Sequence, residues 1–111
     1  MKLYDARAAA TRAVTNNPDR PATALLHDSA DARIVMFRIE SGQEVPVHTS
    51  TSTVLLVVVS GTGTVAGGDA ERRVGPGDIV AYDPQEPHGM RADGEQFVIA
   101  AIIAPRPQPH A

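Results

Sequence analysis

The sequence predicts an all-β fold, a sandwich or barrel of short strands that begins with a short arm. Three observations lead to this fold class. From residue 21 onward the chain consists of short apolar or alternating runs, each ended by turn-forming residues such as Gly, Pro, Asp or Ser. Eight or nine such runs follow one another at short spacing. No segment between them has the pattern of a core helix, and 111 residues are enough for one domain with its own core.

Residues 1–20 are the least patterned part of the chain, and we expect an arm packed on the domain. Residues 6–14 are rich in Ala and Arg, which favour a short helix. Asn16 and Asn17 then favour a turn, and Pro18 disfavours a helix before it. The β-domain follows at residues 21–104.

The expected strands lie between turn residues. They are residues 22–27, 33–40, 45–49, 53–60, 64–66, 71–74, 78–83 and 96–104. The fifth and sixth of these flank Gly67, Gly68 and Asp69, which is a hairpin signature. The Pro-rich tail, residues 105–111, is expected to be extended and loosely held.

The strand at residues 53–60 contains an apolar run from Val54 to Val59. Alternate residues of a strand point to opposite faces, so this strand is apolar on both. An uncovered stripe of Leu and Val favours association. We therefore expect a homodimer in which a second copy covers the outer face, or else an arm that folds over it.

Charge and residue usage exclude several classes of function. The net charge is −3, which argues against a nucleic-acid-binding surface. The absence of Cys excludes disulfides and thiolate sites, and it suits a reducing compartment. The apolar run is too short to cross a bilayer, and no signal-peptide pattern is present. The sequence predicts a cytoplasmic protein without a nucleic-acid or membrane partner.

Two stretches of the sequence resemble the two conserved motifs of the cupin superfamily. The first lies between Gly42 and Gly61, and the second lies between Gly77 and His88. They occur in the expected order, separated by a Gly-rich hairpin. The resemblance covers about residues 33–103. It implies a small single-domain cupin, that is, a double-stranded β-helix barrel of the jelly-roll type.

The metal-binding pattern of this resemblance is incomplete. In typical cupins the two motifs supply three histidines and one glutamate to a divalent metal. By position, His48 matches the first histidine and His88 matches the third. Ser50 stands at the second histidine position, and Val54 stands where the glutamate belongs, seven residues before Gly61. Two of the four ligands are therefore replaced, including the anionic one.

What remains of the motif predicts a weak site. A spacing of two along one strand would place His48 and Ser50 on one face, and Val54 has the same parity. Imidazoles bind transition metals, whereas a serine hydroxyl is a poor ligand and valine offers none. A catalytic zinc site keeps three protein ligands. The resemblance leaves Fe, Mn, Ni, Cu and Zn open.

The leading hypothesis is a small-molecule-binding cupin with a weak or vestigial transition-metal site. Ser50, Val54 and Met90 are expected to line its pocket. A first alternative is a metal-dependent enzyme, a dioxygenase or isomerase, that uses His48 and His88 with a recruited carboxylate or water.

Two carboxylates are further candidate parts of the site, and a metal-free mechanism is a further candidate function. Glu44 and Glu86 are the carboxylates nearest to the histidines in sequence, although a position on the solvated rim is favoured for both. A second alternative is metal-free acid/base catalysis, which the resemblance to sugar-nucleotide epimerases of the superfamily suggests, with His88 as the base. A base of this kind needs an orienting partner, and no Asp is evidently placed for that role.

Overall fold

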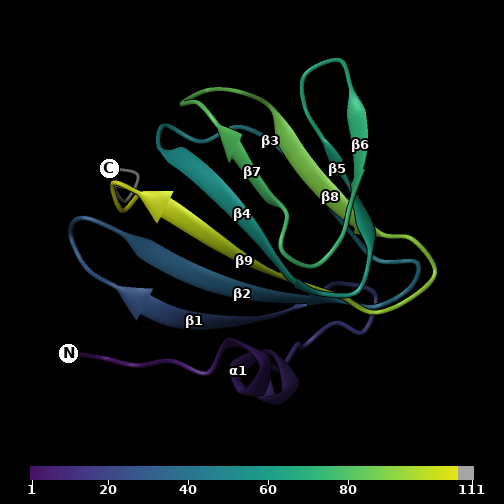
Figure 1. The fold of residues 1–111 in the computed structure, drawn as a ribbon, viewed down its shortest axis with the longest axis horizontal. Coiled ribbons are helices and arrows are strands. Elements are labelled where there is room, and N and C mark those ends of the chain that lie inside the picture. The colour runs from purple at the N-terminus through teal and green to yellow at the C-terminus, as the bar shows by residue number, and fades with distance from the viewer. Residues whose placement is uncertain (108–111) are drawn as a thin grey trace.

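The computed structural model describes residues 1–107, in which one short helix precedes nine strands (Figure 1). The helix and strands are α1 (Ala6–Arg12), β1 (Ala22–Asp28), β2 (Arg33–Ile39), β3 (Glu44–His48), β4 (Thr53–Ser60), β5 (Gly63–Ala66), β6 (Glu71–Val74), β7 (Ile79–Tyr82), β8 (His88–Ala92) and β9 (Phe97–Ala104). The all-β prediction is confirmed. None of the described helices has the length and apolar character needed to cross a membrane.

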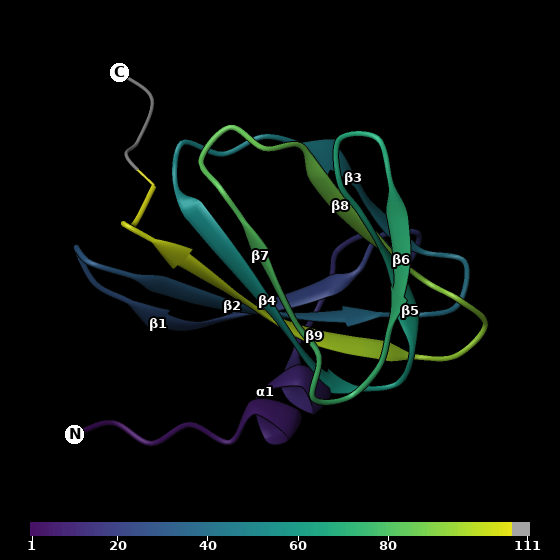
Figure 2. The ribbon, with the colours of Figure 1, turned by 45° about the horizontal axis from the view of Figure 1, so that its top comes forward.

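Two antiparallel sheets face each other, as Figure 2 shows from above. The five-stranded sheet has the order β1-β2-β9-β4-β7, and the four-stranded sheet has the order β3-β8-β5-β6. The core lies between them, where alternate residues of β4 and β9 point inward. Val54, Leu56 and Val58 of β4 are at most 4% exposed, and Phe97 and Ile99 of β9 are fully buried. The strand period of two therefore builds the inner wall of the barrel.

The predicted strands agree closely with the structure, with one omission. The hairpin of β5 and β6 has the expected partners, from Gly63 opposite Val74 to Ala66 opposite Glu71. The missing strand is β8, which lies between β3 and β5 in the four-stranded sheet. Its sequence is short and carries a glycine, both of which weaken a strand pattern. Pairing on both sides outweighs this weak local preference.

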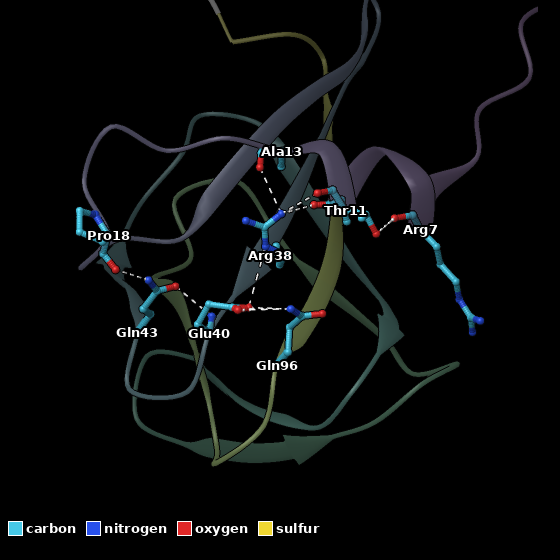
Figure 3. Close-up of polar contacts among 9 residues, drawn as sticks. Arg7, Thr11, Ala13, Pro18, Arg38, Glu40, Gln43 and Gln96 are labelled. Carbon is cyan, nitrogen blue, oxygen red and sulfur yellow. Dashed lines mark hydrogen bonds and ion pairs between the residues drawn. The ribbon is translucent and has the colours of Figure 1, made fainter.

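The N-terminal arm packs on the outer face of the five-stranded sheet. Asp5 caps α1, and the helix buries Ala9 and Ala10 against β1, β2 and β9. Figure 3 shows Arg38 of β2 at the other end of this helix. The helix of the arm thus packs against β1, β2 and β9.

Arg38 fastens the arm through the end of the helix. Its Nη1 atom donates to the carbonyl oxygens of Ala10, Thr11 and Ala13 at 2.7, 3.0 and 3.1 Å (Figure 3). Carbonyls at a helix C-terminus lack partners within the helix, and they favour a cation there. One guanidinium group therefore satisfies three oxygens and joins the arm to β2.

The arm covers only part of the outer face of this sheet. The apolar cluster beneath α1 reaches Val57 and Val59 of β4. It does not include Leu55, Ile79 or Ala81, and Ile79 is 65% exposed. The arm therefore leaves an uncovered apolar patch on this face, which consists of Leu55, Ile79 and Ala81.

A homodimer through this uncovered patch stays a prediction. We expect Ile79→Lys to shift the protein toward monomer, because a buried unpaired charge opposes association. Leu25→Lys is the matched control, since Leu25 is a large exposed side chain of β1 outside the patch. Sedimentation at a protein concentration of about 50 μM compares the variants, because a moderately weak dimer forms on this concentration scale. A monomeric wild-type protein would contradict the prediction.

Candidate functional site

A cavity of about 240 Å³ lies between the two sheets, where β3 ends and β4 and β8 begin. Its lining residues are Phe37, Val45, His48, Thr49, Ser50, Val54, Leu56, His88, Met90, Ala101, Ile103 and Pro107. Eight of these side chains are apolar. The four polar ones are the consecutive residues His48, Thr49 and Ser50, together with His88. The cavity is thus an apolar chamber with polar groups gathered at one side.

The two histidines of the motifs lie next to each other. His48 is the last residue of β3, His88 is the first of β8, and the strands pair them directly. Their ring centroids are 4.3 Å apart, with the planes inclined by 60°. His88 is 6% exposed, whereas His48 is exposed. One imidazole therefore lies deep in the cavity and the other lies toward solvent.

Backbone carbonyls fix the same tautomer in both rings. The Nδ1 atom of His48 is 2.9 Å from the carbonyl oxygen of Pro46, and that of His88 is 3.0 Å from the carbonyl oxygen of Glu86. A carbonyl oxygen only accepts, so each Nδ1 carries the hydrogen. The Nε2 atom of each neutral ring then holds a lone pair, the form that binds a metal or accepts a hydrogen bond.

The free Nε2 of His88 faces the cavity. No hydrogen bond to this atom is present among the described residues, although His88 itself is buried. Within residues 1–107, no fully buried side-chain nitrogen or oxygen is left without a partner. The Nε2 atom must therefore border accessible space, and the cavity is the space that His88 lines. In the neutral ring this Nε2 atom offers its lone pair to a ligand in the cavity.

The ring of Tyr82, on β7, packs against the ring of His88. The two rings lie 5.0 Å apart, inclined by 36°. The Tyr82 hydroxyl donates to the carbonyl oxygen of Ala66 at 2.7 Å. Burial, and secondarily the charge of Glu86, raises the pKa of Tyr82 above its usual value. The phenol therefore stays protonated, and its hydrogen bond to Ala66 fixes the Tyr82 ring next to the imidazole.

Ser50 and Val54 also line the cavity, but not for the reason that the sequence suggested. Both were expected to share one strand face with His48. In the structure His48 ends β3, Ser50 lies in the following loop and Val54 belongs to β4. The strand-parity argument is therefore wrong, because the loop at residues 49–52 interrupts the period of two. The loop nevertheless returns both residues to the cavity.

The two nearby carboxylates do not join the histidines. The Glu86 Oε1 atom accepts a hydrogen bond from the backbone N–H of Asp83 at 2.9 Å, which closes a turn. Glu44 lies opposite Arg91, one residue out of phase with the inward-facing Val45 and Met90. Across residues 1–107, no three His, Cys, Asp or Glu side chains are grouped to hold a metal ion. The enzyme hypothesis needs a carboxylate or water beside the two histidines, and no carboxylate is grouped with them within residues 1–107.

This donor set does not fit a complete cupin metal centre. It offers two neutral imidazoles and the Ser50 hydroxyl, with no anionic ligand beside them. Imidazoles suit Zn, Cu, Fe and Ni, but a catalytic zinc site usually keeps three protein ligands. Val54, 4% exposed, places an isopropyl group in the cavity wall.

Comparison with known families identifies the chain. The sequence pattern of the Cupin domain family matches residues 35–105, well over half of the chain. The chain belongs to the cupin family. The match includes both histidines and the motif glycines. Of these, Gly61 has a φ of +73°, and a side chain there would collide with the backbone of Gln96.

Solved structures of other cupins share this fold. The chain is similar to an RmlC-like cupin protein from Desulfovibrio desulfuricans, with 31% identity, a TM-score of 0.79, and coverage of 95% of this chain and 97% of that one. TT1209 from Thermus thermophilus is 24% identical, with a TM-score of 0.83 and coverage of 96% and 100%. KdgF from Halomonas sp. is 20% identical, with a TM-score of 0.78 and coverage of 85% and 87%. A search of curated proteins found no match.

Several wall residues of this cupin were not identified from the sequence. Leu56, Ala101 and Ile103 have the inward parity of β4 and β9, so the strand pattern could have found them. Pro107 has no such signal, because it lies beyond the last strand. The expected pocket residues Ser50, Val54 and Met90 all line the cavity.

Replacing either histidine tests whether the pair holds a metal. We expect His48→Ala and His88→Ala each to abolish measurable Ni²⁺ or Zn²⁺ binding, since one imidazole alone is a weak ligand. The fold should survive, because within residues 1–107 each ring makes a single hydrogen bond, to a carbonyl two residues away. Calorimetric titration with far-UV circular dichroism measures both effects. Metal binding that persists unchanged in both variants would place the metal elsewhere.

Proposed function

We propose that this cupin binds a small, largely apolar molecule in the cavity, with His48 and His88 as its polar anchors and a weak transition-metal site between them. The observation that carries the proposal is the lining: apolar side chains surround two imidazoles, and each imidazole has its Nδ1 atom against a backbone carbonyl, which in the neutral ring leaves the lone pair on Nε2. Binding sites of this kind combine an apolar wall with a few convergent polar groups.

The size and polarity of the cavity define the class of ligand. A volume of about 240 Å³ lies below the ~300–1,000 Å³ range of drug-sized pockets. Two imidazole lone pairs favour a hydrogen-bond donor. The proposed ligand is therefore a small molecule with an apolar body and one hydroxyl group, for which phenol is a suitable probe.

A weak metal site is compatible with the same geometry. If a divalent transition metal binds, the Nε2 atoms of His48 and His88 would hold it, with Ser50 close by. The metal would supply a Lewis acid that polarises a bound oxygen. This chain's own residues contribute the apolar wall, the two Nδ1–carbonyl hydrogen bonds and the adjacent ring of Tyr82.

Filling the cavity tests the proposal directly. Phenol titrated into the ¹⁵N-labelled protein should bind with a dissociation constant of about 1 mM or tighter. Ala101→Leu adds a larger side chain to the wall of the cavity and should abolish binding without unfolding the protein, since the cavity has room for it. Ala81→Leu is the matched control, because Ala81 is exposed on the outer face. Equal binding by all three proteins, or none by wild type, would contradict the proposal.

A further inference from the structure

The chain beyond β9 returns to the cavity. β9 ends at Ala104, and Pro107 lines the cavity together with both histidines. Residues 105–107, called the strap here, therefore form part of the cavity wall. From the sequence this tail is expected to be extended and loosely held. Residues 105–107 are held at specific contacts, whereas residues 108–111 lie outside the described part of the chain.

The first fastening of the strap is a buried hydrogen bond. The Ser52 hydroxyl donates to the carbonyl oxygen of Pro105 at 2.6 Å, and Ser52 is 2% exposed. The backbone N–H of Ser52 donates in turn to the Ser50 hydroxyl at 3.1 Å. The strap is thus linked to the loop that supplies Ser50 to the cavity.

The second fastening is an ion pair at the turn between β1 and β2. Arg106 Nε lies 3.0 Å from Asp28 Oδ1, and the Arg106 backbone N–H donates to the carbonyl oxygen of Ala30 at 3.4 Å. Asp28 also pairs with Arg33, at 3.3 Å. The Arg106 side chain is 46% exposed, so water screens this contact. The strap therefore has one buried anchor and one weak, solvated anchor.

We propose that the strap is the adjustable wall of the cavity mouth, and that its two anchors set the size of the molecule that the cavity admits. Segments held by few buried contacts open at low cost, and apart from Thr49 and Ser50 in the loop at residues 49–52 the remaining wall consists of strands paired in sheets. Released from Asp28 and Ser52, the strap widens the mouth and exposes His88. This inference rests on the proposed function, because it takes the cavity as the binding site.

The rate at which a chemical probe modifies His88 measures how often the strap opens, and it needs no ligand. Diethyl pyrocarbonate acylates unprotonated imidazole nitrogens, and the modified residue is located by peptide mass spectrometry. We expect Arg106→Glu to raise the rate of His88 acylation about threefold, the scale of effect that losing an exposed ion pair allows. Ser52→Ala should act in the same direction. Arg33→Glu is the matched control, since Arg33 contacts the same carboxylate but belongs to β2.

A second experiment tests whether the strap selects ligands by size. 2-Naphthol keeps the hydroxyl of phenol on a larger apolar body. Its affinity relative to phenol should rise in Arg106→Glu and stay at the wild-type ratio in Arg33→Glu. Equal His88 acylation in wild type and Arg106→Glu would overturn the strap proposal, as would an equal increase in Arg33→Glu. If Ser52→Ala fails to fold, Arg106→Glu still decides, because its side chain lies at the surface.

The two proposals fail in different ways. Absence of phenol binding to wild type overturns the proposed function, while the acylation rates still report on the strap. Phenol binding that Ala101→Leu abolishes, together with unchanged acylation in Arg106→Glu, keeps the binding site and overturns the strap.

Discussion

Replacing Val54 with Glu is expected to lower the free energy of unfolding of the metal-free protein by about 3 kcal/mol. Val54 lies on the inner face of β4, opposite Tyr82 and Ile103, and is 4% exposed. The cavity wall offers a carboxylate there no Lys or Arg side chain as a partner. For a chain of this size the loss corresponds to a drop of about 10–20 °C in Tm.

Metal should reverse this loss, because Glu at this position restores the anionic ligand of the cupin motif beside His48 and His88. A ligand that binds only the folded state stabilises it in proportion to the logarithm of its concentration over Kd. Thermal melts with and without Zn²⁺ measure the reversal. Val58→Glu is the control: Val58 is equally buried on β4 but does not line the cavity. Equal rescue of both variants would show that the metal acts elsewhere.

The pH dependence of the Val54→Glu deficit follows from the same burial. Burial raises the pKa of such a carboxyl above its unfolded value of about 4.3, so the folded state binds the proton more tightly. The deficit relative to wild type is then full at neutral pH and shrinks as the pH falls through the raised pKa toward about 4. Val54→Gln cannot ionise, and its deficit should not change over this range.

Replacing Ser50 with His should tighten Ni²⁺ or Zn²⁺ binding by at least about tenfold, or 1.4 kcal/mol. The new imidazole would be a third nitrogen ligand in the cavity wall that already holds His48 and His88. The substitution removes the acceptor for the Ser52 backbone N–H, so a small loss of stability accompanies it.

A histidine in the same loop but outside the cavity controls for this gain. Thr51 is exposed and does not line the cavity. Thr51→His should leave the affinity at the wild-type value in calorimetric titration. If Ser50→His gains nothing, Ser50 does not occupy the second ligand position of the motif.

The sequence predicts the fold well because the strands of the core are long and strongly apolar. β4 and β9 each have eight residues, and their alternation defines the inner wall. β8 has no such signal: its pattern is short, polar and interrupted by Gly89. It is a strand because β3 and β5 pair with it on both sides, a long-range effect that no local pattern contains.

The candidate site is predictable where a motif fixes it and not where loops build it. The motif spacing identified His48 and His88, and the backbone pairing of β3 with β8 brings them together. The tautomer of each ring depends on a nearby carbonyl, and the strap depends on Ser52 and Arg106. These contacts depend on side-chain orientation and on loop geometry, so a strand pattern gives no sign of them.

The central claim is that this cupin keeps two histidines of a metal site in a pocket adapted to small molecules. Calorimetric titration of the wild-type protein with Ni²⁺ and Zn²⁺ tests it most directly. Two imidazoles without an anionic ligand predict an affinity well short of the nanomolar range, that is, weaker than about −12 kcal/mol. A nanomolar dissociation constant for wild type would contradict the claim, because it would require ligands that the cavity wall of His48, Ser50, Val54 and His88 does not supply.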